Sequence, residues 1–138
     1  MKWSRAELLQ ADKQTIDFTD TIAFDPAAFA KMHQIRGLQD VTVSGNIHYD
    51  TASERVFADL DIEGVMIVPC SITLEDVEYD FHTKSLEVFS FDKTEDEDVH
   101  EVKGDVVELL PVIFQLILME VPLKVVKEGI KEYPKGRS

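Results

Sequence analysis

The sequence predicts an α+β fold: a largely antiparallel β-sheet, short helices near the amino terminus and an amphipathic helix packed on one face near the carboxyl end. Three observations support this class. Apolar and polar residues alternate along several segments between residues 14 and 91, which is the period of a half-buried strand. Short turn-forming segments join these stretches and favour hairpins over crossovers. Nearer the carboxyl end, apolar residues recur at steps of three and four, as on one helical face.

The amino-terminal elements are expected to be short. Ser4 can cap a helix, and Glu7 stands three residues later as its capping-box partner. Evenly spaced apolar residues from 14 to 24 then predict a strand. An Asp-Pro pair at positions 25 and 26 predicts the start of one or two helical turns, because proline is favoured at the first helical position, and Gly37 would stop them.

The middle of the chain reads as consecutive antiparallel strands. Residues 41–49 and 56–62 alternate on either side of turn material at 50–53. Gly64 interrupts the second alternation, which predicts a bulge or bend there. Further alternation, carried first by Ile72 and Leu74 and then by the residues up to 91, changes register near position 75, so a second bulge is expected.

The carboxyl-terminal part combines a helix with a basic tail. Pro111 lies inside the helical pattern, so the helix either kinks there or begins near Leu110, and the second alternative predicts a helix over 110–120. Residues 1–123 are therefore expected to form a single domain and residues 124–138 a flexible, basic tail. Its five cations are candidate RNA contacts: Lys124, Lys127, Lys131, Lys135 and Arg137.

Charge and cysteine content exclude several classes of function. The 138 residues include 27 acidic and 14 basic ones, a net charge of -13, which repels phosphate and argues against a broad nucleic-acid-binding surface. A basic protein partner is easier to accommodate. With one cysteine, neither an internal disulfide nor a multi-cysteine zinc site can form. No signal peptide or membrane-length apolar stretch is evident, so a cytoplasmic protein is expected.

Motifs for catalysis are missing from the sequence. The histidines are scattered along the sequence, and the surroundings of Cys70 are acidic. Both features disfavour a reactive thiolate and favour a structural role for Cys70. There is no HxH or HExxH pair, no phosphate-binding glycine loop and no GxSxG elbow. The sequence thus predicts neither an enzyme nor a bound cofactor.

The strongest compositional shift lies between residues 92 and 101. No glycine occurs between Phe91 and Lys103, so an EF-hand calcium loop is not expected. The segment is too polar to bury and reads as an exposed, mobile loop or as a docking segment for a cationic partner. Its candidate partner-binding residues are Asp92, Glu95, Asp96, Glu97, Asp98 and Glu101.

Several blocks together resemble a known family. They are Met1-Lys2-Trp3-Ser4, the stretches from Val41 to Gly45 and from Val68 to Leu74, and the segments 98–101, 104–109 and 117–123. Their order and spacing resemble the YceD family of large ribosomal RNA subunit accumulation proteins, in the form typical of Gram-positive bacteria. Many members carry cysteine pairs that suggest zinc. Here Thr73 stands where the second cysteine of the strand block would fall, so a zinc site is not carried over.

This resemblance implies a non-catalytic role in 23S ribosomal RNA accumulation and large-subunit assembly. Two mechanisms follow from the charges. The acidic surface could contact a basic ribosomal protein or a large-subunit assembly intermediate, since complementary charge speeds encounter. Alternatively, the basic tail could bind ribosomal RNA directly. No membrane partner is expected, and the oligomeric state stays open.

Overall fold

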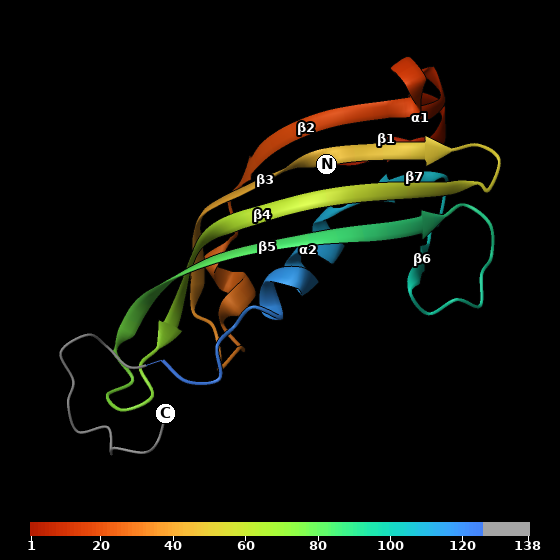
Figure 1. Cartoon of the computed structure of the whole chain (residues 1–138). Coiled ribbons are helices and arrows are strands. Elements are labelled where there is room, and N and C mark those ends of the chain that lie inside the picture. Colours follow the sequence, from red (N-terminus) through yellow and green to blue (C-terminus); the bar gives the residue numbers. More distant parts are fainter. Residues whose placement is uncertain (126–138) are drawn as a thin grey trace.

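The computed structural model describes residues 1–125, in which long strands dominate (Figure 1). In chain order the elements are β1 (Lys2–Ser4), α1 (Arg5–Gln10), η1 (Asp12–Gln14), β2 (Thr15–Ile22), η2 (Pro26–Phe29), β3 (Gly37–Asp50), β4 (Arg55–Pro69), β5 (Asp76–Ser90), β6 (Val99–Glu101), β7 (Val106–Glu108) and α2 (Leu110–Leu118).

The predicted α+β class is wrong, because the fold is mostly β: 49% of the described residues lie in strands and 18% in helices. Among the described residues, α2 is the one helix longer than six residues. The capping box at Ser4 and Glu7 is present, but it opens a helix of six residues rather than a helical layer. After the Asp25 cap, only a single 3-10 turn forms where one or two helical turns were expected.

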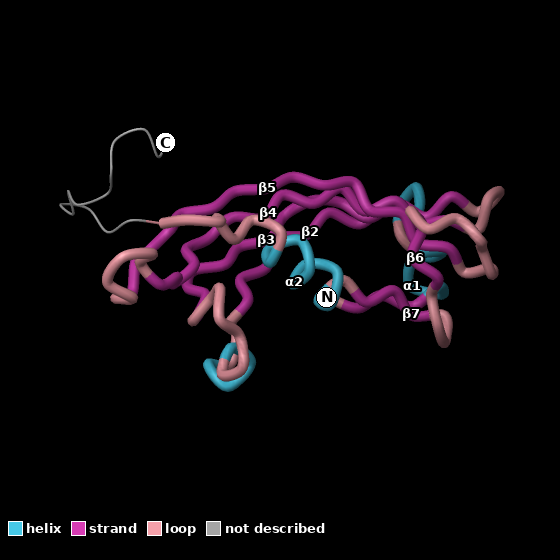
Figure 2. The backbone as a smooth tube through the Cα atoms, turned by 90° about the horizontal axis from the view of Figure 1, so that it is seen from below, coloured by secondary structure: helices cyan, strands magenta, loops and turns pink. Residues whose placement is uncertain are grey.

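Five strands form one mixed sheet in the order β2-β3-β4-β5-β6. The first three pairings are antiparallel, whereas β5 and β6 run parallel over three residue pairs, from Val88 opposite Val99 to Ser90 opposite Glu101. The β4–β5 pairing runs without a register shift from Arg55 to Pro69. The three central strands therefore extend together as a long, bent ribbon (Figures 1 and 2).

The strands continue through two glycines at which neighbouring backbone comes close, and they are longer than the sequence indicated. Gly64 stays inside β4 and faces a bulge on β3, where the register shifts between Gln39 and Thr42. The predicted bulge is thus real, but the extra residue lies on the partner strand. At Gly45, with φ of 157°, an added Cβ would lie 1.8 Å from the carbonyl oxygen of Asp59, so only glycine fits.

The predicted strand through Ile72 and Leu74 is also wrong. Both residues are exposed and lie in the loop that joins β4 to β5. Cys70 and Glu75 close this loop, since the Cys70 amide donates to the Glu75 carbonyl at 2.8 Å. The register change near position 75 therefore marks a hairpin loop rather than a bulge.

One face of the sheet carries the core. Even-numbered residues of β4 from Val56 to Val68 are buried there, apart from Gly64, and their odd-numbered neighbours are half-buried or exposed. Helix α2 packs against this inner face through Ile113 and Ile117, both fully buried (Figure 2). Its start at Leu110, with Pro111 in the first turn, confirms the sequence prediction.

A second, two-stranded sheet joins the beginning of the chain to its later part. β1 pairs antiparallel with β7, from Lys2 opposite Glu108 to Ser4 opposite Val106. Trp3 of β1 lies 5.1 Å from Phe18 of β2, measured between ring centroids. The small sheet therefore packs on the inner face, leaving the outer face of the large sheet uncovered by any described element (Figure 2).

Candidate protein-interaction surface

The uncovered outer face of the large sheet is rich in carboxylates. Side chains alternate across a strand, so the residues opposite in parity to the buried set point outward on each strand. We call the outward acids of β2, β4 and β5 the acidic face: Asp17, Asp59, Asp61, Glu63, Asp76, Glu78 and Asp80. All are exposed or half-buried, so the face offers negative charge along most of the ribbon.

One carboxylate of this face, Asp61, contacts two neighbouring side chains of β5. Asp61 contacts the Nε2 of His82 at 2.6 Å and the Nζ of Lys84 at 3.8 Å. Farther along β5, the Arg36 guanidinium binds the carboxylate of Asp76 at 2.6 Å. Such exposed pairs contribute at most about 1 kcal/mol each, so the remaining carboxylates dominate the potential of this face.

The acidic run predicted from the sequence lies at one end of the same sheet. Residues 92–98, which we call the acidic loop, connect β5 to β6 and are exposed apart from the half-buried Thr94. The loop is locally ordered, because the Asp98 amide donates to the Oδ1 of Asp96 at 3.0 Å. Glu101 belongs instead to β6, opposite Ser90. The structure thus places five of the predicted residues together in the acidic loop and separates Glu101 from them: Asp92, Glu95, Asp96, Glu97 and Asp98.

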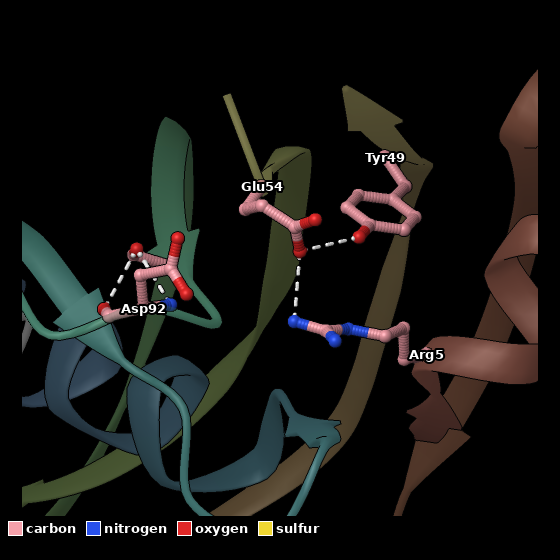
Figure 3. Close-up of polar contacts among 5 residues, drawn as sticks. Arg5, Tyr49, Glu54 and Asp92 are labelled. Carbon is pink, nitrogen blue, oxygen red and sulfur yellow. Dashed lines mark hydrogen bonds and ion pairs between the residues drawn. The ribbon is translucent and has the colours of Figure 1, made fainter. Parts of the chain in front are cut away.

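A polar cluster fixes the base of the acidic loop (Figure 3). The Oε2 of Glu54 accepts hydrogen bonds from Arg5 of α1 and from the hydroxyl of Tyr49, both at 2.8 Å. The Arg5 guanidinium also lies 4.5 Å from the ring centroid of Phe91, which leads into the loop. The Phe91 amide donates to the Glu54 carbonyl. Helix α1, the β3–β4 turn and the loop are therefore held together.

The hydroxyl of Tyr49 in this cluster has a raised pKa. Burial raises the pKa of its hydroxyl above the ordinary value of 10.0, and the hydrogen bond to Glu54 raises it further, while nearby Arg5 opposes the shift. The hydroxyl therefore stays a neutral donor over the physiological range. Its hydrogen bond to Glu54 orients the carboxylate that also receives Arg5.

Beside α2, the inner face opens into a groove of about 610 Å³. Ser85 and Glu87 of β5 and His100 of β6 line one wall, and apolar residues such as Leu116 and Met119 line the other. Glu87 bridges its neighbours, accepting a hydrogen bond from Ser85 and contacting the Nε2 of His100 at 2.8 Å. The serine contacts the carboxylate rather than the imidazole, so the trio lacks the relay of a hydrolase triad.

Of the other candidate residues singled out in the sequence, Cys70 and Lys124 lie within residues 1–125, and the rest lie outside them. Cys70 is fully buried, consistent with a structural thiol. Lys124 precedes Val125, whose carbonyl accepts a hydrogen bond from the Ser71 amide at 2.7 Å. The other predicted RNA contacts, Lys127, Lys131, Lys135 and Arg137, lie outside the described residues, as does most of the predicted flexible tail.

Residues 1–125 offer neither a metal centre nor a membrane-spanning helix. In this part of the chain, no group of three or more His, Cys, Asp or Glu side chains is arranged so that it could hold a metal ion. None of the helices described is both long and apolar enough to cross a membrane. The fold and the exposed charges define an acidic β-sheet protein whose carboxylates occupy the free face of the sheet and a loop at its end.

Comparison with known proteins places this acidic β-sheet protein in a family. The family model described as large ribosomal RNA subunit accumulation protein YceD matches residues 58–137. An uncharacterized protein of Bacillus subtilis (strain 168), YlbN, is 36% identical over 136 residues, covering 96% of this chain and 77% of that protein. The chain belongs to the YceD family, which confirms the resemblance noted in the sequence. No solved structure matches it.

Proposed function

We propose that this protein is a non-catalytic factor that supports 23S ribosomal RNA accumulation and large-subunit assembly by binding a basic ribosomal or assembly protein. The observation that supports this mechanism is the acidic face, together with the acidic loop at its end. Family membership supports the process, since the family is named for accumulation of the large ribosomal RNA subunit. Proteins that bind RNA neutralise its phosphates with cationic side chains, and an anionic surface can bind such a protein before it reaches the RNA.

The charges of this surface favour encounter and selectivity more than affinity. Individual exposed ion pairs contribute about 0–1 kcal/mol and weaken with salt. Affinity then requires apolar contacts, which Leu86 can supply because it is 61% exposed on the outer side of β5. A partner that combines cations with apolar residues fits this surface better than a polyanion does.

Affinity capture from lysate, with and without nuclease, tests the proposal. We expect retention of a basic large-subunit protein after nuclease treatment, and weaker retention at high salt. A variant with neutralised carboxylates on the acidic face (Asp59→Asn, Glu63→Gln and Asp80→Asn) should lose the partner. The matched control neutralises as many exposed acids elsewhere (Asp25→Asn, Asp105→Asn and Glu108→Gln) and should keep it.

Two results would overturn the proposal. Partner capture that survives the acidic-face variant unchanged would remove the mechanism. Capture that disappears with nuclease would instead favour direct RNA binding through the basic tail. In cells lacking the protein, an unchanged ratio of large-subunit to small-subunit ribosomal RNA would remove the role in assembly itself.

A further inference from the structure

Strand β5 has a long edge that no described element covers. It pairs with β4 along its whole length, from Asp76 to Ser90, but β6 pairs with Val88 to Ser90 alone. Within residues 1–125, no other backbone hydrogen bond is made to residues 76–87. This leaves about 40 Å of strand, at roughly 3.3 Å per residue, with one side open (Figures 1 and 2).

The residues that present their backbone to this edge can be identified. The Ser90 carbonyl accepts a hydrogen bond from the Val102 amide on the β6 side. Because the N–H and C=O of one strand residue point to the same side and alternate along the strand, even-numbered residues of β5 face the open edge. These residues are Asp76, Glu78, Asp80, His82, Lys84 and Leu86.

Charge makes this edge a poor site for a second copy of the chain. An exposed edge ordinarily invites pairing with another strand. Here Glu78 and Asp80 stand at the edge, and the acidic loop enters β6 at Val99, so Asp98 lies at its far end. A second copy would bring its own carboxylates to the edge, and only registers such as Glu78 opposite Lys84 would avoid pairing like charges, which is unfavourable. A cationic strand would meet opposite charges instead.

The two sides of the edge set different requirements for such a strand. Side chains on its outer side would lie beside the acidic face. Those on its inner side would lie beside Ser85 and Glu87, which form one wall of the groove, with apolar residues of α2 on the other wall. A strand with alternating cationic and apolar side chains satisfies both sides.

We infer that the free edge of β5 binds an extended segment of a basic protein as an added parallel or antiparallel strand. The segment places cationic side chains over the acidic face and apolar side chains over the groove beside α2. Backbone pairing supplies affinity and the two surfaces supply selectivity, as in other cases of strand addition. The inference rests on the proposed function and deepens it by naming the form in which the basic partner is recognised.

A synthetic peptide in which lysine alternates with valine tests the inference on the full chain. Two N-methylated versions block alternate backbone amides, one set in each. Since only one set can face β5, one version should lose about tenfold or more in affinity and the other should bind like the parent. Equal binding by both versions, or equal binding by a peptide of the same composition in permuted order, would show attraction by charge alone and overturn the inference.

A variant of the edge gives an independent readout. Lys84→Pro removes an edge-facing N–H, and proline is tolerated on edge strands at such positions. The matched control Lys84→Ala loses the same side chain but keeps the N–H. We expect the control to bind the peptide as tightly as the parent or tighter, and the proline variant to bind at least about tenfold more weakly with an unchanged urea midpoint. A proline variant that folds and binds like the control contradicts the inference.

The same two variants separate this inference from the proposed function. In cells lacking the protein, the Lys84→Ala chain should restore large-subunit RNA, and the Lys84→Pro chain should fail. Restoration by both refutes strand addition and leaves the assembly role intact. If even the parent chain leaves large-subunit RNA unchanged, the proposed function fails, whereas the peptide measurements still decide strand addition.

Discussion

Replacing Glu54 tests whether the polar cluster stabilises the fold and holds the acidic loop. In Glu54→Ala, the hydroxyl of Tyr49, which is 3% exposed, loses its acceptor. An unsatisfied buried hydroxyl costs about 1–3 kcal/mol. The ion pair with Arg5 is about one-third exposed on each side, so its loss adds only about 0–1 kcal/mol. The expected loss in unfolding free energy is therefore about 1–4 kcal/mol.

Glu54→Gln separates the two contributions. The amide oxygen can still accept from Tyr49, so only the charge-assisted part is lost, about 1 kcal/mol or less. Urea unfolding followed by the fluorescence of Trp3 measures both variants. At an m-value of about 2 kcal/mol/M, the alanine variant should reach its unfolding midpoint at a urea concentration about 0.5–2 M lower than the parent.

A control and a contrary outcome complete this experiment. Glu97→Ala, an exposed change within the acidic loop, should stay within about 0.5 kcal/mol of the parent. If alanine and glutamine at position 54 cost the same, the Tyr49 hydrogen bond contributes nothing and the reasoning fails. A loss below about 0.5 kcal/mol for Glu54→Ala would refute the structural role of the cluster altogether.

Three further outcomes are expected from the same unfolding assay. Gly45→Ala should lower the unfolding free energy by about 3 kcal/mol or more, because the new Cβ meets the Asp59 carbonyl. At Gly104, a Cβ would have nothing within 4 Å, but φ is 69°, so Gly104→Ala should cost about 1 kcal/mol. Similar costs for the two variants would contradict the close approach at Gly45. Ser4→Ala should cost about 1 kcal/mol through loss of the cap and Ser4→Asp much less, and equal costs would argue against capping. The raised pKa of Tyr49 means that the folded state keeps a proton that the unfolded state releases near pH 10. The contribution of Tyr49 to the unfolding free energy is therefore fully present below that pH and is lost as the pH rises through the pKa of the folded state. Tyr49→Phe should remove this part of the alkaline loss, and parallel pH profiles for parent and variant would disprove it.

Local signals predicted the individual elements better than the fold class. Ser4 with Glu7, and Pro111 at the start of α2, gave correct helix starts because capping and proline geometry depend on nearby residues alone. Gly64 indicated a break, whereas β4 continues through it opposite the bulge on β3. Whether a glycine ends a strand or bends it depends on the neighbouring strand, which one sequence does not reveal. The strands were therefore predicted too short and the helical share too large.

The candidate surface was predicted in part. The acidic loop was visible as a run of carboxylates, but the acidic face combines residues such as Asp17, Asp59 and Asp80 from three strands. The signal for it was present, because acids alternate with apolar residues along β4 and β5. Strand register decides whether such acids share one face, and that register follows from pairings that sequence alone did not order. The Arg5–Glu54 contact likewise joins positions far apart in the chain.

The pairing of β1 with β7 has a consequence for how the chain matures during synthesis. Lys2 and Glu108 lie more than one hundred residues apart, so the earliest-made strand finds its partner only after nearly all other strands have left the ribosomal exit tunnel. Until then Trp3 is not held by the pairing of β1 with β7, and non-local contacts of this kind slow folding. A nascent chain halted before β7 should therefore remain sensitive to protease at its beginning, and one released after α2 should not.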